Sequence, residues 1–264
     1  MNCVVIGKGR AGAARVRTIQ EHPHCTLIRH VSGREFQEPK ENERSLYFVC
    51  TENRKHYETG KMLLEHGHHV AIEFPPCLNQ KEWNTLISLA QQKESILHCG
   101  LIGLYTQQHK HRKKWICEQR PDNVCVEFSG GLYRWVQEEA ALSRVPLLAF
   151  GRIAAIWDLF GPLRVTEVTL DKTSHSYTFT LQAKGRLGED VFLRERRAEG
   201  MSRSTAWSMT RSNGELFFPP ARTKENLFGV DLERILQRTP SDVNISDVFA
   251  FLDHVHAMTY GDRK

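Results

Sequence analysis

The sequence lacks the features that define membrane proteins and several enzyme classes. No segment approaches the roughly 18 consecutive apolar residues that a membrane-spanning helix needs. There is no internal repeat, no Gly-x-Ser-x-Gly element, no P-loop and no Ser/His/Asp order, which disfavours hydrolysis and phosphoryl transfer. Because a strand-like segment begins at Cys3, we expect no signal or transit peptide and predict a cytoplasmic protein.

The cysteine pattern indicates neither a disulfide framework nor a zinc site. The 7 cysteines are odd in number, never form a C-x-x-C pair and lie mostly in apolar runs, so we interpret them as reduced core residues. A second cluster of possible ligands, His66-Gly67-His68-His69, is typical of a helix-to-strand turn whose side chains alternate outward. We therefore expect no metal site.

Charge is mildly basic and scattered. The formal net charge is +5, and basic residues gather only at 110–114 and 194–197. Both clusters are interpreted as solvated surfaces, so we predict no nucleic-acid partner and no membrane partner. The balance favours an anionic small molecule over a cationic one.

The first hundred residues alternate between short apolar runs and amphipathic segments. The predicted strands are Cys3 to Ile6, Thr26 to Val31, Leu46 to Cys50, His69 to Phe74 and Ile96 to Leu101, and the predicted helices are Ala11 to Gln20, Lys55 to Glu65 and Lys81 to Gln92. Apolar strands separated by helices predict a doubly wound parallel sheet in an α/β fold. We place this Rossmann domain at residues 1–103.

The pattern changes in the remaining chain, for which we predict an α+β domain over residues 104–264 with a large, mostly antiparallel sheet. The predicted strands are 124–128, 165–172, 177–183, 191–196, 206–210 and 215–218, and the predicted helices are 105–118, 147–160, 227–237 and 245–256. This domain should form the substrate side. We expect a monomer, or a homodimer through its sheet.

The stretch Gly7-Lys-Gly-Arg-Ala-Gly12 has the spacing of a dinucleotide-binding turn, and it follows a strand and opens a helix. Gly7 permits the tight turn, Gly9 leaves the backbone bare for a pyrophosphate, and Gly12 lets the helix pack on the strand. The helix N-terminus can then hold the phosphates.

The end of the second strand favours NADPH, with NADH as a weaker alternative. NAD-binding sites usually place Asp or Glu there, about twenty residues after the glycines, whereas this chain has Ser32 and Arg34, which suit a 2′-phosphate. Arg10 adds to the positive field, while Arg15 and Arg17 are interpreted as solvated residues of the helix surface. Glu35 either points away or supplies the missing ribose ligand.

The chain resembles the glucose-fructose oxidoreductase and inositol dehydrogenase superfamily, and within it the biliverdin reductase family. The likeness covers essentially the whole chain. It is carried by Gly9-Arg-Ala-Gly12 with Arg15 and Arg17, Val31-Ser32-x-Arg34-Glu35, Cys50-x-Glu52 with His56, Gly67-x-His69-Val70, Glu73-x-Pro75, Leu97-His98, and Arg152 with Leu159-Phe-Gly161. The resemblance implies NADPH-dependent hydride delivery to the central methine carbon of a linear tetrapyrrole, yielding bilirubin from biliverdin.

The glycine turn and this resemblance together define the predicted site. The predicted cofactor-binding residues are Gly7, Gly9, Arg10, Ala11, Gly12, Ser32, Arg34, Cys50, Thr51, Glu52, His56, Glu73 and Phe74. Phe74, Leu101 and Arg152 are predicted to bind substrate, and Arg152 and His98 to act in catalysis. Alternatives remain open: a structural ion pair for Arg152, a satisfied core position for His98 and a helix N-terminal position for His56.

Two departures from the family pattern define a second hypothesis. Phe74 stands where relatives carry lysine or tyrosine, and Cys99-Gly-Leu-Ile-Gly103 replaces an acidic stretch. Without a lysine or tyrosine at position 74 to move the hydroxyl proton, the sequence disfavours oxidation of a sugar alcohol. A bilin, in contrast, accepts hydride while a pyrrolic nitrogen takes the proton. The alternative function is a catalytically impaired paralogue that keeps NADP(H), with or without a bilin, as a sensor or interaction module.

Overall fold

The protein is described by a computed structural model that covers residues 1–40, 42–221 and 223–261. The chain forms two compact units, Met1–Thr106 with Lys224–Ser246, and Gln107–Thr223 with Asp247–Lys264. A division at residue 103 alone leaves 224–246 with the second half of the chain. In the structure this segment belongs to the first unit, because its helix contributes to that unit's core.

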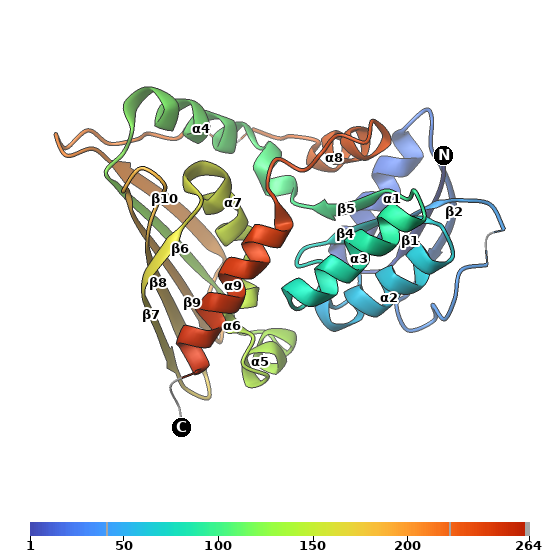
Figure 1. Ribbon diagram of the computed structural model, residues 1–264, viewed down its shortest axis with the longest axis horizontal. Coiled ribbons are helices and arrows are strands. Elements are labelled where there is room, and N and C mark those ends of the chain that lie inside the picture. The colour runs from blue at the N-terminus through green and yellow to red at the C-terminus, as the bar shows by residue number, and fades with distance from the viewer. Residues whose placement is uncertain (41, 222, 262–264) are drawn as a thin grey trace. The chain divides into compact units, whose positions relative to one another are not determined.

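The first unit is built on a five-stranded, wholly parallel sheet, as the sequence predicts (Figure 1). Its strands are β1 (Asn2–Ile6), β2 (Thr26–Val31), β3 (Leu46–Val49), β4 (His69–Glu73) and β5 (Leu97–Gly100), in the order β2-β1-β3-β4-β5. Its helices are α1 (Arg10–Glu21), α2 (Asn53–Glu65), α3 (Gln80–Gln92), the 3-10 helix η1 (Ile102–Tyr105) and α8 (Leu227–Leu236). The strand order reverses beside β1, and open α/β sheets bind ligands at the carboxyl ends of the strands at such a point.

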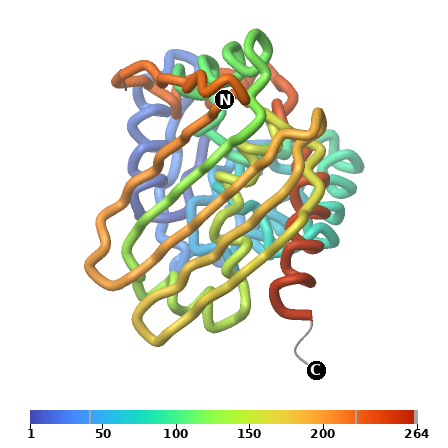
Figure 2. The backbone as a smooth tube through the Cα atoms, turned by 90° about the vertical axis from the view of Figure 1, so that its left-hand side faces the viewer, coloured from blue at the N-terminus to red at the C-terminus, as the bar shows by residue number. Residues whose placement is uncertain are grey.

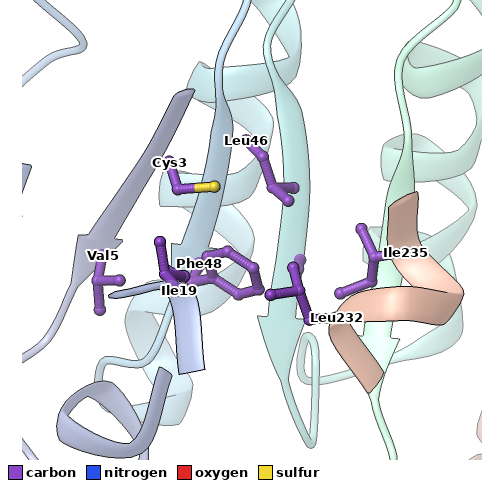
Figure 3. Close-up of a cluster of buried hydrophobic side chains, with 8 residues drawn as sticks. Cys3, Val5, Ile19, Leu46, Phe48, Leu232 and Ile235 are labelled. Atoms are coloured by element: carbon purple, nitrogen blue, oxygen red, sulfur yellow. The ribbon is translucent and has the colours of Figure 1, made fainter. Parts of the chain in front are cut away.

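Helix α8 joins the core on the same face of the sheet as α1. Cys3 and Phe48, from neighbouring strands, pack with Ile19 of α1 and with Leu232 and Ile235 of α8 (Figure 3). All five side chains are at most 1% exposed. A segment more than 170 residues away in sequence therefore completes the hydrophobic layer over β1 and β3.

The second unit contains a five-stranded sheet in the order β10-β6-β9-β8-β7 (Figure 2). Its strands are β6 (Asn123–Gly131), β7 (Arg164–Lys172), β8 (Ser176–Lys184), β9 (Asp190–Ala198) and β10 (Ser204–Thr210). Its helices are α4 (Gln107–Gln119), α5 (Arg134–Ala141), α6 (Val145–Leu148), α7 (Phe150–Phe160) and α9 (Ile245–Tyr260). Strands β6 and β9 pair in parallel and the other neighbours are antiparallel, so the predicted mostly antiparallel sheet is confirmed.

Helices α7 and α9 pack against each other through aromatic side chains. The Phe150 and Phe249 ring centroids are 5.1 Å apart, and those of Trp157 and Phe251 are 5.4 Å apart. Both helices lie on one face of the second sheet (Figure 1). Figure 2 shows the other face, which no helix of this unit covers within the described residues. That face carries polar pairs such as Arg194 and Glu127, whose Nη1 and Oε1 atoms are 3.1 Å apart.

Three elements of the second unit differ from the sequence prediction. The predicted helix 147–160 is divided into α6 and α7, and α5 was not predicted. The predicted strand 215–218 is reduced to a single bridge between Thr210 and Leu216. The chain leaves the sheet there because Pro219 and Pro220, which have no N–H to donate, follow at once.

Candidate functional site

The glycine turn has the geometry that its spacing predicts. Gly7 has a φ of +121°, a conformation that favours glycine, and a Cβ on it would overlap the Cys50 carbonyl. A Cβ on Gly12 would overlap the Gly7 carbonyl, so α1 packs as closely on the turn as backbone allows. A Cβ on Gly9, in contrast, would meet nothing within 4 Å. Gly7 and Gly12 are thus required by the protein itself, while Gly9 faces open space.

The N-terminus of α1 is available to an anion. Gly9 is the N-cap residue and provides no side-chain hydrogen bond. The helix continues through Arg10, which is exposed, and Ala11, which is half-buried. Uncapped N–H groups at a helix N-terminus bind phosphate readily, because they donate hydrogen bonds and carry the positive end of the helix dipole.

The segment after β2 folds into a small turn around Ser32. The backbone N–H of Ser32 donates to Glu35 Oε2 at 3.2 Å, and the N–H of Glu35 donates to Ser32 Oγ at 3.2 Å. Lys8 Nζ lies 3.4 Å from the same Glu35 oxygen. Glu35 therefore folds back on the turn, and Arg34 beside it is exposed. The structure brings Ser32, Arg34 and the glycine turn to one edge of the first sheet.

The loop after β3 lies against this turn. Cys50 donates its N–H to Ile6 O at 2.8 Å, which continues the pairing of β3 with β1, and burial raises the pKa of its thiol. A Cβ on Gly33 would lie 2.6 Å from Thr51 Cγ2. Glu52, the N-cap residue of α2, pairs with Arg54 at 2.7 Å.

His56 braces two loops in the structure. Its ring is 1% exposed; Nδ1 lies 2.7 Å from Pro75 O and Nε2 lies 3.1 Å from Thr51 O. Burial lowers the pKa of His56 more than these carbonyls raise it, so the ring is neutral and donates to one of them. His56 thus contacts both the loop after β3 and the loop after β4, with a hydrogen bond to one of them, and its contact with a cofactor remains a prediction.

A buried charge network lies behind the end of β4. Arg15 Nε and Nη2 contact Glu73 Oε1 at 3.0 and 2.9 Å, and Arg15 Nη1 lies 2.6 Å from Asp231 Oδ2. Asp231 Oδ1 in turn lies 2.8 Å from His98 Nε2. The network joins α1, β4, β5 and α8 and holds the carboxylate of Glu73 away from solvent.

This network shows that the expected position of Arg15 was wrong, and it contains one residue, Asp231, that the sequence analysis did not identify. Arg15, expected on the solvated surface of α1, has a side chain that is only 2% exposed, because it follows Gly12 and precedes Ile19 on the buried face of the helix. Asp231 was not predicted. Burial raises the pKa of Asp231, but the bond to His98 and the Arg15 charge outweigh it, so its pKa lies below the usual range. Burial raises the pKa of Glu73 despite Arg15.

The residues predicted to face substrate in the first unit differ in exposure. Phe74, directly after β4, is 40% exposed, whereas Leu101 is 3% exposed and His98 is 6% exposed. His98 lies inside β5, not at its end, and its Nε2 is engaged by Asp231. Phe74 thus has a free face for a ligand, and His98 is placed to position the network.

Arg152, in the second unit, lies on α7 in a cluster of arginine and aromatic side chains. It pairs with Glu195 and stacks on the Phe128 ring, with 4.1 Å from Cζ to the centroid. Arg197 also contacts Glu195, at 2.7 Å, and stacks on Phe128 at 4.7 Å. Tyr177 donates to Glu195 at 2.8 Å. Arg197, which is buried, and Arg152, which is half-buried, share one carboxylate, which leaves the cluster positive.

The histidine cluster at 66–69 is structural. His68 and His69 are buried, contrary to the expectation that these side chains point outward, because each accepts a backbone hydrogen bond from a strand start. His68 Nδ1 accepts from Ser45 at 3.3 Å, and His69 Nδ1 accepts from Ile96 at 3.1 Å. Within the described residues no group of three or more His, Cys, Asp or Glu side chains is arranged to hold a metal ion.

Fold and site together define an oxidoreductase with an NAD(P)-binding Rossmann fold. Residues 34–101 match the family model described as "Oxidoreductase family, NAD-binding Rossmann fold". The open space at Gly9 and the uncapped N-terminus of α1 fit the diphosphate of the cofactor, NAD(H) or NADP(H). Among the described residues, no helix combines the length and the apolar character that crossing a membrane requires.

The chain is related to the biliverdin reductases at low identity. It is 25% identical to biliverdin reductase A of Mus musculus over 266 residues. This alignment covers 94% of this chain and 88% of the mouse protein. The fold is similar to that of biliverdin reductase from Synechocystis, solved with biliverdin and NADP+, with a TM-score of 0.76, 17% identity and coverage of 96% of each chain. A UDP-N-acetylglucosamine 3-dehydrogenase from Acidithiobacillus ferrooxidans has a TM-score of 0.75 at 15% identity, covering 99% of this chain and 98% of that one. The fold is thus shared by relatives with different substrates.

Proposed function

We propose that this protein reduces biliverdin, or a similar linear tetrapyrrole, to bilirubin with NADPH. The observation that carries the proposal is the sequence similarity to biliverdin reductase A along 94% of the chain. The complete glycine turn supplies the cofactor site that such a reaction requires. When bound, NADPH provides the hydride, which adds to the central methine carbon, while a pyrrolic nitrogen takes a proton and NADP+ is released.

The first unit binds the cofactor in this proposal. The N–H groups at the start of α1 hold the diphosphate, and Gly9 gives it access to the backbone. Ser32 and Arg34 receive the 2′-phosphate, since a guanidinium pairs with phosphate in a planar, bidentate manner. NADPH is therefore preferred and NADH is the weaker cofactor. Phe74 offers an apolar face and no proton.

The second unit binds the anionic, aromatic substrate. Arg152 Nη2 donates to Leu148 O and pairs with Glu195, and the side chain is 16% exposed. Its Nε has no hydrogen-bond partner among the described residues but is buried, so a ligand carboxylate reaches this donor only if the side chain shifts. Glu195 holds Arg152 and Arg197 over Phe128 and fixes their orientation before substrate arrives. The charges of Arg152 and Arg197 outweigh burial and keep the pKa of Glu195 low, so it stays ionised. Arg152 is the proposed catalytic residue, acting by orientation and charge, and the proton comes from solvent or a propionate.

The test mixes the protein with NADPH and biliverdin and follows loss of the biliverdin absorption band and growth of the bilirubin band. We expect turnover in the wild type, and a loss of about 10²-fold or more in Arg152→Ala with little change in NADPH affinity. Arg134→Ala is the matched control, because Arg134 also pairs with a glutamate but its side chain is 92% exposed. Equal turnover in Arg152→Ala and Arg134→Ala would remove Arg152 from the site.

The second candidate is a paralogue without catalytic activity that binds NADP(H), with or without a bilin. Two observations favour it: Phe74 carries no proton donor, and the ion pair with Glu195 occupies part of the Arg152 guanidinium. In the same assay this candidate predicts a shift of the biliverdin band on mixing, with no bilirubin formed. Turnover in Phe74→Tyr but not in the wild type would support it further.

A further inference from the structure

A charge pair crosses from the glycine turn to the end of β2. Lys8 stands between Gly7 and Gly9, and its Nζ lies 3.4 Å from Glu35 Oε2. The same Glu35 oxygen accepts the Ser32 N–H at 3.2 Å. The Lys8 charge is thereby held next to Ser32, although 24 positions of sequence separate the two residues.

The carboxylate of Glu35 is restrained and ionised. The hydrogen bonds from Ser32, and then the charge of Lys8, lower the pKa of Glu35 below its usual value. Both side chains remain accessible, since Lys8 is 56% and Glu35 is 64% exposed. An exposed ion pair of this kind is weak and exchanges its partner easily.

The residue that follows Ser32 cannot contribute a side chain here. A Cβ on Gly33 would lie 2.6 Å from Thr51 Cγ2, so the turn packs directly on the loop after β3. Gly33 itself adds no side chain to this turn, so the cations beside it are Arg34 of the same segment and Lys8, which its bond to Glu35 places there.

We propose that Lys8 and Glu35 determine whether a 2′-phosphorylated or an unphosphorylated adenine dinucleotide is bound. This inference rests on the proposed cofactor site and deepens it. Lys8 leaves Glu35 for the 2′-phosphate, because a phosphate carries more negative charge than one carboxylate and makes a stronger charge-assisted bond. Glu35 opposes that phosphate by like-charge repulsion and favours a free 2′-hydroxyl, for which it is an acceptor.

The experiment is calorimetric titration of NADP+ and, separately, NAD+ into the wild type, Lys8→Met and Glu35→Gln. Lys8→Met should raise the Kd for NADP+ about 10-fold and change that for NAD+ by less than about 2-fold. Glu35→Gln should lower the Kd for NADP+ several-fold and raise that for NAD+. The effect of Lys8→Met should shrink at high salt, since exposed charges are screened.

Lys61→Met is the matched control, because Lys61 also forms an exposed pair, 2.8 Å from Glu65, but on α2. It should leave both affinities unchanged, and thermal unfolding without nucleotide should be similar for all variants. Equal changes for NADP+ and NAD+ in Lys8→Met, or no change for either, would overturn the inference while leaving the cofactor site intact. Absence of binding of both nucleotides to the wild type would refute the cofactor site itself, and this inference with it.

Discussion

Replacement of Asp231 by alanine should destabilise the first unit strongly. Asp231 is fully buried, lies 2.6 Å from Arg15 Nη1 and 2.8 Å from His98 Nε2, and is the only carboxylate that α8 contributes to the network among the described residues. Its removal leaves a buried guanidinium with one partner, Glu73, and a buried imidazole with none at Nε2. Removing one partner of a buried ion pair costs about 3 to 5 kcal/mol.

Hydrogen exchange measured on peptides from α8 and β5 reports the first unit separately from the second. Because about 1.4 kcal/mol corresponds to a factor of ten, protection of these amides should fall by about 10²- to 10⁴-fold in Asp231→Ala. Glu233→Ala is the control on the same helix. Glu233 is 55% exposed and pairs with His22 at 2.9 Å, so its loss should cost less than about 1 kcal/mol.

The comparison of these two variants decides whether the network stabilises the unit. Similar loss of protection in Asp231→Ala and Glu233→Ala would show that the buried pair contributes no more than a surface pair. The reasoning from burial would then be wrong, and the place of α8 in the unit would depend on Leu232 and Ile235 alone.

Two further predictions concern the glycine turn and acid stability. Gly9→Ala should raise the Kd for NADP+ at least about 10-fold in calorimetry with little change in Tm. Gly12→Ala should also lower Tm, because a Cβ on Gly12, but not one on Gly9, overlaps the Gly7 carbonyl. Equal Tm values for the two variants would contradict this reasoning. Burial lowers the pKa of His69 to about 4 from 6.5, so its contribution to stability is complete above pH 6.5 and is lost as pH falls toward 4. The loss amounts to about 3 kcal/mol, and urea titrations at pH 7 and pH 4.5 should show most of it in the wild type but not in a stable His69→Gln variant.

Short-range patterns carried most of the fold prediction. The glycine turn was predictable because Gly7, Gly9 and Gly12 act within one strand-turn-helix unit, where the backbone alone sets the requirement. Strands β1 and β3 were predictable because they are apolar on both faces, whereas the edge strand β2 also carries Arg29 and His30 and is only partly buried. The end of β2 was predictable only in part: Ser32 and Arg34 lie at the expected edge, but the bond of Glu35 to Lys8 depends on side-chain conformations that no spacing reveals.

Long-range contacts account for what the sequence did not predict. Arg15 was predicted to lie on the surface because it is charged. Gly12 and Ile19, however, lie at i−3 and i+4 from it, and this spacing places Arg15 on the buried face of α1. Its partner Asp231 is 216 positions away, so no local pattern joins them. The parallel pairing of β6 with β9 could not be predicted either, because the alternation of apolar and polar residues along a strand does not specify which strand lies next to it.

The segment 224–246 explains why a boundary near residue 103 describes the nucleotide-binding unit incompletely. Leu232 and Ile235 are each 1% exposed in its core, and burying such a side chain contributes about 1.5 to 3 kcal/mol. The cofactor-binding unit is thus built from two separate parts of the chain. Asp231, whose carboxylate pairs with Arg15, follows most of the second unit in the sequence but belongs to the first unit.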